Sequence, residues 1–196
     1  MNVKKRNGDS EKLCVDKINS VVIWACEGLD ANPSDIIMNA NIQIFDGIKT
    51  TKIHEILINS SIDLISINNP DYQYVASRLC SYYNRKQIFG VFKDEDMPTV
   101  KYVVEQNINN GLYDKEILNK FDDETWTKIN DIVDHSNDSK LTIASYQKML
   151  ATYLVKNRHS GYVYETPQYS FIVIAAALFS TLKEIREFYK ELTSKS

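Results

Sequence analysis

Near the start of the chain, polar residues surround an Asn-Gly pair between two short segments that contain apolar residues, and the pattern then changes to helical spacing. Residues 2–15 contain VKKR, an Asn7-Gly8 pair and EKLCV, which is typical of a β-hairpin whose tight turn needs positive φ angles. From Asp16 onward the apolar residues recur on one helical face, and Gly28 is suited to end that helix. The pattern therefore predicts a hairpin that leads into a helix.

Three further helices are predicted before residue 92, each from a start signal that precedes helical spacing of apolar residues. A capping side chain or a proline in the first turn is the usual signal of this kind. The signals are Asn32-Pro33, Thr50 or Thr51, and Asn69-Pro70-Asp71, and the last helix should end near Gly90. Residues 1–92 are thus expected to form a four-helix unit with a β-hairpin cap.

The polar stretch KDEDMPT, residues 93–99, contains a proline and is interpreted as a domain boundary. Beyond it, the spacing predicts a helix from Val100 to Asn110-Gly111, two short helical segments, and a loop at residues 135–140. Two short β segments should flank a turn within residues 153–165, before Pro167 opens an apolar helix. We therefore expect a mainly α protein, with a second domain at 93–196 that is helical and carries a short hairpin.

Composition narrows the class of protein. With 43% hydrophobic and 25% charged residues, the chain is typical of folded globular proteins, and its net charge of -3 argues against a nucleic-acid partner. The longest apolar run, Phe171 to Phe179, is shorter than the roughly 20 residues of a membrane-spanning helix. No secretory signal is visible, so a cytoplasmic location is expected. The three cysteines show no CxxC spacing, which favours reduced thiols over a disulfide framework or a metal site.

The N-terminal domain gathers several cations near predicted helix starts. A nucleoside triphosphate needs this combination, because cations neutralise its charge and backbone N–H groups at a helix N-terminus receive its oxygens. Glu11 would repel phosphates, so we expect it to point to the other end of the ligand and accept from a base amino group. The candidates on spacing are Lys5, Arg6, Glu11, Lys17, Thr50, His54 and Lys86, with no catalytic residue and no metal ligand assigned.

Each candidate also has a plainer interpretation, since no phosphate-binding glycine loop is present. The cationic hairpin can be a solvated strand, as we expect for Lys4. His54 can be a helix-start histidine, and the lysines can be ordinary helix-surface residues. The spacing of the tyrosines in PDYQYVASRLCSYY indicates helix packing, and His135 and His159 are expected to be loop residues.

The string VKKRNGDSEKLCVDKI resembles the opening of an ATP-cone, the nucleotide-sensing domain found at the N-terminus of many ribonucleotide reductases. The resemblance continues through WACEGLD, FDGIKTTKIHE, NPDYQYVASRL and RKQIFGVF. The later strings GLYDKEIL, YLVKNRHSGYVYETPQYSFIVIAAALF and FYKEL resemble the beginning of the large (alpha) subunit of a class I ribonucleoside-diphosphate reductase. The resemblance covers essentially the whole chain in order.

The resemblance implies an allosteric site for ATP as activator or dATP as inhibitor, with or without Mg²⁺. Cys14 stands where relatives often carry a polar residue near the base, and Asn7 replaces the commoner aspartate of the turn. The remaining positions match the family's motif: Lys5 and Arg6 its basic pair, Glu11 its acidic residue near the base, Lys17 its helix-opening lysine, Thr50 and His54 its TxxxH arrangement, and Lys86 the lysine of its RK pair.

The resemblance also implies partners for this chain, and it implies that the catalytic residues lie outside it. The family's reaction needs a thiyl-forming cysteine and a dithiol in a barrel, whereas Cys14, Cys26 and Cys80 fall on the cone. We therefore expect no redox cofactor in this chain and no catalysis by it alone. The implied partners are the remaining part of the large subunit and a radical-generating small subunit, in an oligomer. Two alternatives stay open: a free-standing ATP-cone sensor, although paired CxxC motifs of such repressors are lacking, and a nonfunctional remnant of an interrupted gene.

Overall fold

The computed structural model describes residues 1–194 and is mainly helical. Its packing divides the chain into two units, of which the first contains residues 1–83 and 142–144 and the second contains the rest. The division falls inside the helix α4 (Tyr72–Ile88). The predicted boundary between residues 92 and 93 concerns domains that fold on their own, and it stays a prediction.

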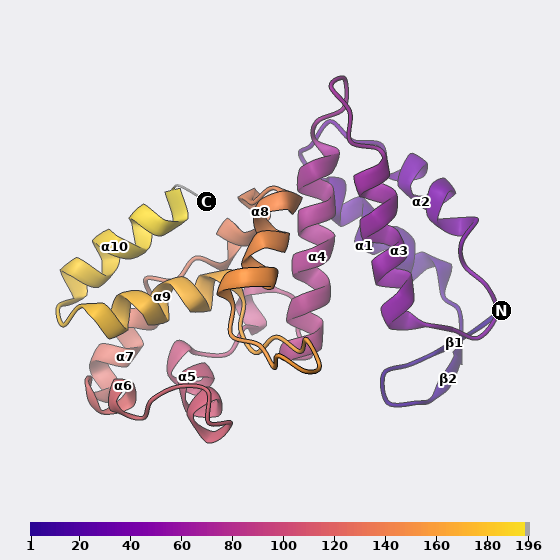
Figure 1. Ribbon diagram of the computed structural model, residues 1–196. Coiled ribbons are helices and arrows are strands. Elements are labelled where there is room, and N and C mark those ends of the chain that lie inside the picture. The colour runs from indigo at the N-terminus through magenta and orange to yellow at the C-terminus, as the bar shows by residue number, and fades with distance from the viewer. Residues whose placement is uncertain (195–196) are drawn as a thin grey trace. The chain divides into compact units, whose positions relative to one another are not determined.

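The first unit opens with a small sheet, β1 (Asn2–Lys4), β2 (Ser10–Lys12) and β3 (Ile48–Lys49), in the order β2-β1-β3 (Figure 1). The predicted hairpin of β1 and β2 is confirmed, with Val3 opposite Glu11. Its turn differs from the expected one, because Gly8 has a φ of 92° while no other residue type among those described has a positive φ. Gly8 N donates to the Lys5 carbonyl and Lys5 N to that of Asp9, as in a type I turn followed by a left-handed glycine.

Strand β3 was not predicted, since two residues are too short to show alternation. It pairs in parallel with β1, with Lys4 beside Lys49. The chain then turns directly into α3, so Lys49 takes the extended N-cap position and Thr50 is the first helical residue. The prediction that a threonine caps this helix is therefore wrong.

Four helices follow the signals read from the sequence. Asn32 caps its helix as predicted, because its side chain accepts from Ser34 N and Pro33 occupies the first turn. Gly28 and Gly90 follow helix ends with left-handed φ angles. The helices are α1 (Val15–Cys26), α2 (Pro33–Asn41), α3 (Thr50–Asp63) and α4 (Tyr72–Ile88). Their buried apolar side chains include Val22, Ala25, Ile36, Ile53, Leu57, Val75 and Leu79.

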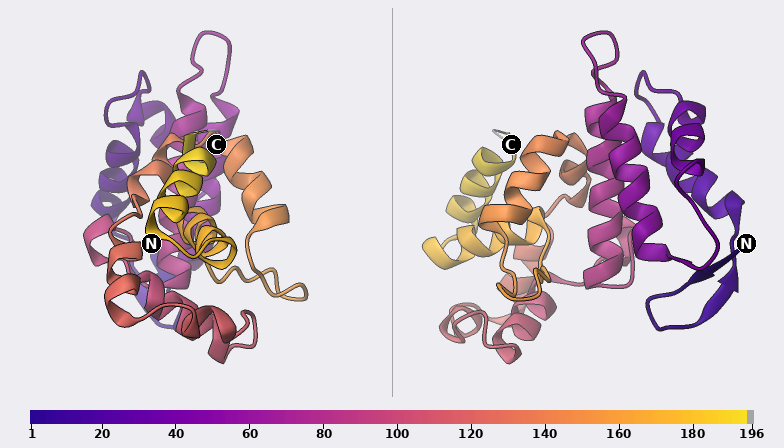
Figure 2. Two further views of the ribbon diagram at one scale, coloured as in Figure 1. Left: turned by 90° about the vertical axis from the view of Figure 1, so that its left-hand side faces the viewer. Right: turned by 45° about the vertical axis from the view of Figure 1, so that its right-hand side comes forward.

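The second unit has its core around Trp126, Tyr169 and Ile172. The predicted apolar helix is α9, which begins at Pro167 as expected and packs beside α10 (Figures 1 and 2). The elements after α4 are η1 (Asp94–Asp96), α5 (Val100–Asn109), α6 (Glu116–Asn119), α7 (Asp123–Asn130), η2 (His135–Lys140), α8 (Ile143–Lys148), the π-helical η3 (Met149–Tyr153), α9 (Pro167–Leu178) and α10 (Leu182–Ser194).

Two predictions for this unit need correction. Residues 135–140, expected to be a loop, form the 3-10 helix η2, and its Asp138 is buried. The two β segments expected within 153–165 are reduced to a single bridge between Lys156 and Val163. Backbone hydrogen bonds from Asn157 N to the Tyr162 carbonyl and from Tyr164 N to the Val155 carbonyl lie on either side of this bridge. The side chain of Asn157 accepts from the N–H groups of the turn that follows. Along the part of the chain that is described, helices are too short or too polar to cross a bilayer.

Candidate functional site

The loop of the N-terminal hairpin carries two of the four cations of the predicted site, Lys5 and Arg6. The whole VKKR segment before Asn7-Gly8 was predicted to form a strand of the hairpin. Strand β1 ends at Lys4, however, so Lys5 and Arg6 lie in the loop. The Asn7 amide donates to Asp9 Oδ2 (2.7 Å) and its oxygen accepts from Asp9 N (3.1 Å), which braces the loop locally. Since Lys4 pairs with Lys49, the loop begins beside the start of α3.

Lys5 and Glu11 form an ion pair, with 2.7 Å between Lys5 Nζ and Glu11 Oε2. The sequence had suggested that Glu11 points away from the cations, but the ion pair shows that its carboxylate contacts one of them. It stands opposite Val3, and Lys5 is two residues further along the same side of the hairpin, within diagonal reach of a long side chain. The hydrogen bond raises the pKa of Lys5 and lowers that of Glu11, to which the charge of Lys17 adds. Both side chains remain accessible, at 44% and 34% exposure.

The helices α1 and α3 begin without a capping side chain. Cys14 is exposed at the N-cap of α1, and Lys49 holds that position in α3, and neither makes a side-chain cap hydrogen bond. By contrast, Asn32 caps α2 and Thr99 caps α5. The first turn of α3 contains no acidic residue. Uncapped N–H groups, the positive end of the helix dipole and adjacent lysines together favour the binding of an anion at the start of α3.

A group of aromatic rings connects the hairpin loop with α3 and α4. The His54 ring lies 5.6 Å from that of Tyr82 and 5.4 Å from that of Tyr83, centre to centre. The Arg6 guanidinium lies over the Tyr83 ring at 5.3 Å, and Trp24 meets Tyr82 at 5.9 Å. Burial raises the pKa of Tyr83, and Arg6 partly offsets that rise. The structure thus brings Arg6 and His54 to one ring.

Sequence reasoning missed Tyr83, because it assigned all tyrosines of this helix to packing. That interpretation suits Tyr82, which is buried, but Tyr83 is only half-buried and meets Arg6. No local signal could have identified it, since the contact joins a hairpin loop to a helix far along the chain. Lys86 belongs to the second unit, where its ammonium lies 5.1 Å from the centre of the Phe92 ring. Its participation beside the other candidates stays a prediction.

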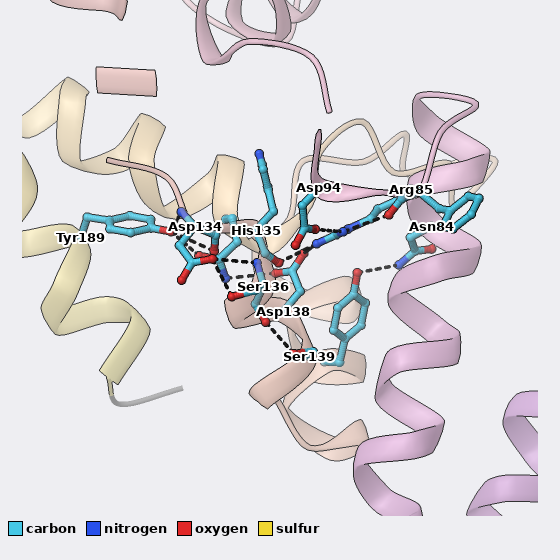
Figure 3. Close-up of polar contacts among 12 residues, drawn as sticks. Asn84, Arg85, Asp94, Asp134, His135, Ser136, Asp138, Ser139 and Tyr189 are labelled. Atoms are coloured by element: carbon cyan, nitrogen blue, oxygen red, sulfur yellow. Dashed lines mark hydrogen bonds and ion pairs between the residues drawn. The ribbon is translucent and has the colours of Figure 1, made fainter. Parts of the chain in front are cut away.

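Next to Lys86, Arg85 is the centre of a buried ionic network in the second unit (Figure 3). Its Nη1 donates to the Phe92 carbonyl (3.1 Å) and Asp94 Oδ1 (2.6 Å). Its Nη2 donates to the His135 carbonyl (2.6 Å) and Asp138 Oδ2 (3.1 Å). Burial lowers the pKa of Arg85, but the two carboxylates outweigh this effect and the pKa is raised. The guanidinium therefore stays charged inside the protein.

The network continues from Asp138 to the last helix. Gln168 Nε2 donates to Asp138 Oδ1 (3.0 Å), and the Tyr189 hydroxyl donates to Gln168 Oε1 (2.6 Å). The Tyr189 hydroxyl also accepts from Asp134 N (3.0 Å). The sequence did not reveal this network, because HSNDSK has the composition of a solvated loop. Its buried charge becomes evident only when Arg85 reaches it.

The second unit also contains a hollow of about 460 Å³. No lysine, arginine or histidine lines it, so it is poorly suited to a triphosphate. Its lining residues are Ile88, Phe89, Val91, Asp96, Pro98, Tyr102, Val103, Gln106, Asn107, Asn110, Tyr162 and Tyr164. Within residues 1–194, no three His, Cys, Asp or Glu side chains gather in a way that could hold a metal ion.

Two protein families match the chain. Residues 1–87 match the ATP cone domain, and residues 139–196 match the all-alpha domain of ribonucleotide reductase. The first match ends at the last turn of α4 and contains every candidate side chain. The second begins at the end of η2 and contains α9 and α10.

Several curated proteins are similar over nearly the whole chain. The ribonucleoside-diphosphate reductase subunit alpha of Buchnera aphidicola subsp. Schizaphis graminum is 37% identical over 98% of this chain and 26% of its own length. The ribonucleoside-diphosphate reductase 1 subunit alpha of Escherichia coli strain K12 is 36% identical over the same shares. The alpha subunit of Enterobacteria phage T4 is 32% identical over 100% of the chain and 26% of its own length. The chain therefore spans about a quarter of the length of these relatives.

Proposed function

Because the chain belongs to the class I ribonucleotide reductase alpha subunits, as their N-terminal portion with an ATP cone and all-alpha domain, we propose that it binds a nucleoside triphosphate effector. The effector is ATP or dATP, and its binding regulates ribonucleotide reduction. The observation that carries the proposal is the parallel pairing of β1 with β3, since it sets the Lys5 loop beside the uncapped start of α3. An anionic ligand there meets both a cation and free backbone donors.

The phosphates are received by cations from several elements. Lys5 and Arg6 come from the hairpin loop, Lys17 from the first turn of α1, and Lys86 from the last turn of α4. The N–H groups that open α3, together with the Thr50 hydroxyl and His54 one turn later, bind further phosphate oxygens. Charge-assisted hydrogen bonds contribute on the order of 1.5–3 kcal/mol each, so a few of them support micromolar affinity.

The ion pair of Lys5 with Glu11 suggests how the phosphates and the base of the nucleotide are each bound. Exposed ion pairs contribute little to stability, so a phosphate can replace Glu11 on the Lys5 ammonium. The released Glu11 carboxylate then accepts from the amino group of the adenine base. Cys14, exposed at the start of α1, lies near this end of the ligand and affects base selectivity.

Regulation requires more than binding. ATP and dATP differ by one hydroxyl group, and only a difference in their affinity for two assembly states can shift the equilibrium between those states. We propose that the chain acts with the remaining part of an alpha subunit and a radical-generating small subunit in the reduction of ribonucleoside diphosphates, in an oligomer and in the cytoplasm. Catalytic residues are assigned to those partners and not to this chain.

Calorimetric titration with ATP and dATP tests the proposal. Lys5→Ala should weaken the binding of both nucleotides by about tenfold or more, as expected for loss of a charge-assisted hydrogen bond. Lys4→Ala is the matched control, because it removes the same charge from the neighbouring exposed residue at the end of the strand. Titrations with Mg²⁺ and with a chelator decide whether the metal accompanies the nucleotide.

The outcomes separate the alternatives. Equal losses in the Lys5→Ala and Lys4→Ala variants would indicate a general charge effect and contradict the proposed pocket. A chain that folds poorly and binds neither nucleotide would favour the remnant of an interrupted gene. The free-standing sensor is disfavoured by the match of residues 139–196 to the all-alpha domain.

A further inference from the structure

The side chain of Lys86 contacts an aromatic ring in the second unit. Its ammonium lies over the Phe92 ring, 5.1 Å from the ring centre, in a cation–π contact. A lysine side chain otherwise samples many rotamers, and fixing it before a ligand arrives avoids part of the entropy cost of binding. The direction in which Lys86 presents its charge therefore depends on where Phe92 is held.

Phe92 is held by Arg85. The backbone carbonyl of Phe92 accepts from Arg85 Nη1 at 3.1 Å, and the same nitrogen binds Asp94 two residues later at 2.6 Å. These two contacts fasten the segment after Gly90 to the last turn of α4. They therefore set the place of the Phe92 backbone relative to Lys86, the next residue along the helix.

Arg85 is itself fixed from the opposite side. Its Nη2 binds the His135 carbonyl and Asp138 Oδ2, and Figure 3 shows it reaching from α4 to both η2 and Asp94. The Arg85 side chain is 8% exposed and that of Asp138 is 1% exposed. A buried guanidinium with four acceptors has little freedom, so it makes a rigid support for its surroundings.

We propose that Arg85 is a positioning residue of the effector site, which holds Phe92 and through it restricts the Lys86 ammonium before a nucleotide binds. The proposal rests on the proposed function, because it needs Lys86 to bind phosphate. Arg85 does not touch the nucleotide. It converts an ordinary helix-surface lysine into a preorganised one, and it ties that lysine to the buried network of the second unit.

A cycle of variants in the full chain tests this, with ATP affinity measured by calorimetry. Phe92→Leu removes the ring while leaving the Arg85 contacts in place, and Arg85→Lys retains a charge but cannot hold four acceptors. Each should weaken ATP binding about five- to tenfold, the size expected when a long side chain must be ordered on binding. In the Lys86→Ala background, neither change should weaken binding further. Lys93→Ala, at an exposed neighbouring position, is the control.

A structural role alone gives a different result, because it would lower the affinity by the same factor with and without Lys86. That outcome would overturn the inference, as would an affinity in the Phe92→Leu variant equal to that of the unchanged chain. If Arg85→Lys fails to fold in thermal unfolding, Phe92→Leu carries the test. Failure of the proposed function is recognised separately, since the unchanged chain would then bind no ATP and Lys5→Ala would change nothing.

Discussion

The two units each contain a pair of opposite charges, and the two pairs have different surroundings. Lys5 and Glu11 are 2.7 Å apart with 44% and 34% of their side chains exposed. Arg85 and Asp138 are 3.1 Å apart with 8% and 1% exposed. The exposed pair is screened by water and can exchange a partner for a ligand, whereas removal of either partner of the buried pair leaves the other buried with less compensation of its charge. The first arrangement suits binding and the second suits holding a segment in place.

Removing the buried carboxylate should have the largest effect. Asp138→Ala leaves the Arg85 guanidinium buried without its main partner in η2, so we expect a loss of about 3–5 kcal/mol in the free energy of unfolding. Urea denaturation measures this, with Asp131→Ala, at an exposed position of the same unit, as control. A loss for Asp138→Ala no larger than that of the control would show that the buried pair is not a support.

The histidine beside this network should make stability depend on pH. Burial lowers the pKa of His135 from 6.5 to about 4, with the charge of Arg85 adding to this. Between these values the unfolded chain binds a proton that the folded chain does not, so stability should fall by about 2–3 kcal/mol as pH decreases from 6.5 to 4. His135→Gln should remove this part of the dependence in urea titrations over that range. His159→Gln, in the exposed turn, should retain it.

The turn of the hairpin offers a smaller test in the exposed region. Gly8 has a φ of 92°, and a Cβ atom at this position would have no neighbour within 4 Å, so an alanine there meets conformational strain and no clash. Gly8→Ala should cost about 1 kcal/mol in unfolding free energy. It should also weaken ATP binding, because the turn carries Lys5 and Arg6. If the variant were measurably destabilised but bound ATP with unchanged affinity, the loop would not be part of the ATP site.

The exposed ion pair should give the smallest change in stability. Glu11→Gln removes the charge that Lys5 contacts, yet the midpoint of urea unfolding should stay within experimental error, since exposed pairs are screened. If this variant shifted the midpoint as much as Gly8→Ala does, the pair would be part of the structural framework. It would then be unsuited to exchange with a phosphate.

Local signals predicted much of the fold because they act over a few residues. The Asn32-Pro33 start, the Pro167 start and the glycine ends at Gly28 and Gly90 were all found where the sequence placed them. Each depends on a backbone preference of the residue itself. The mainly helical class followed from these signals and from the apolar spacing between them.

Contacts between distant residues could not be predicted in this way. Strand β3 exists because two residues pair with β1 more than forty positions earlier, and that pairing is what brings the hairpin loop to α3. Asp138 is buried because Arg85, 53 positions away, reaches it. For the candidate site, residue types and a family resemblance could be read from the chain, but the pairing of Glu11 with Lys5 and the Tyr83 ring beneath Arg6 required the structure.

Amide hydrogen exchange with and without ATP tests the central claim most directly, because it reports where a nucleotide contacts the backbone. We predict that saturating ATP slows exchange in the hairpin loop, residues 5–9, and in the first turn of α3 that begins at Thr50. Slower exchange elsewhere in the chain, with these two segments unchanged, would contradict the proposal that Lys5 and the start of α3 together receive the triphosphate.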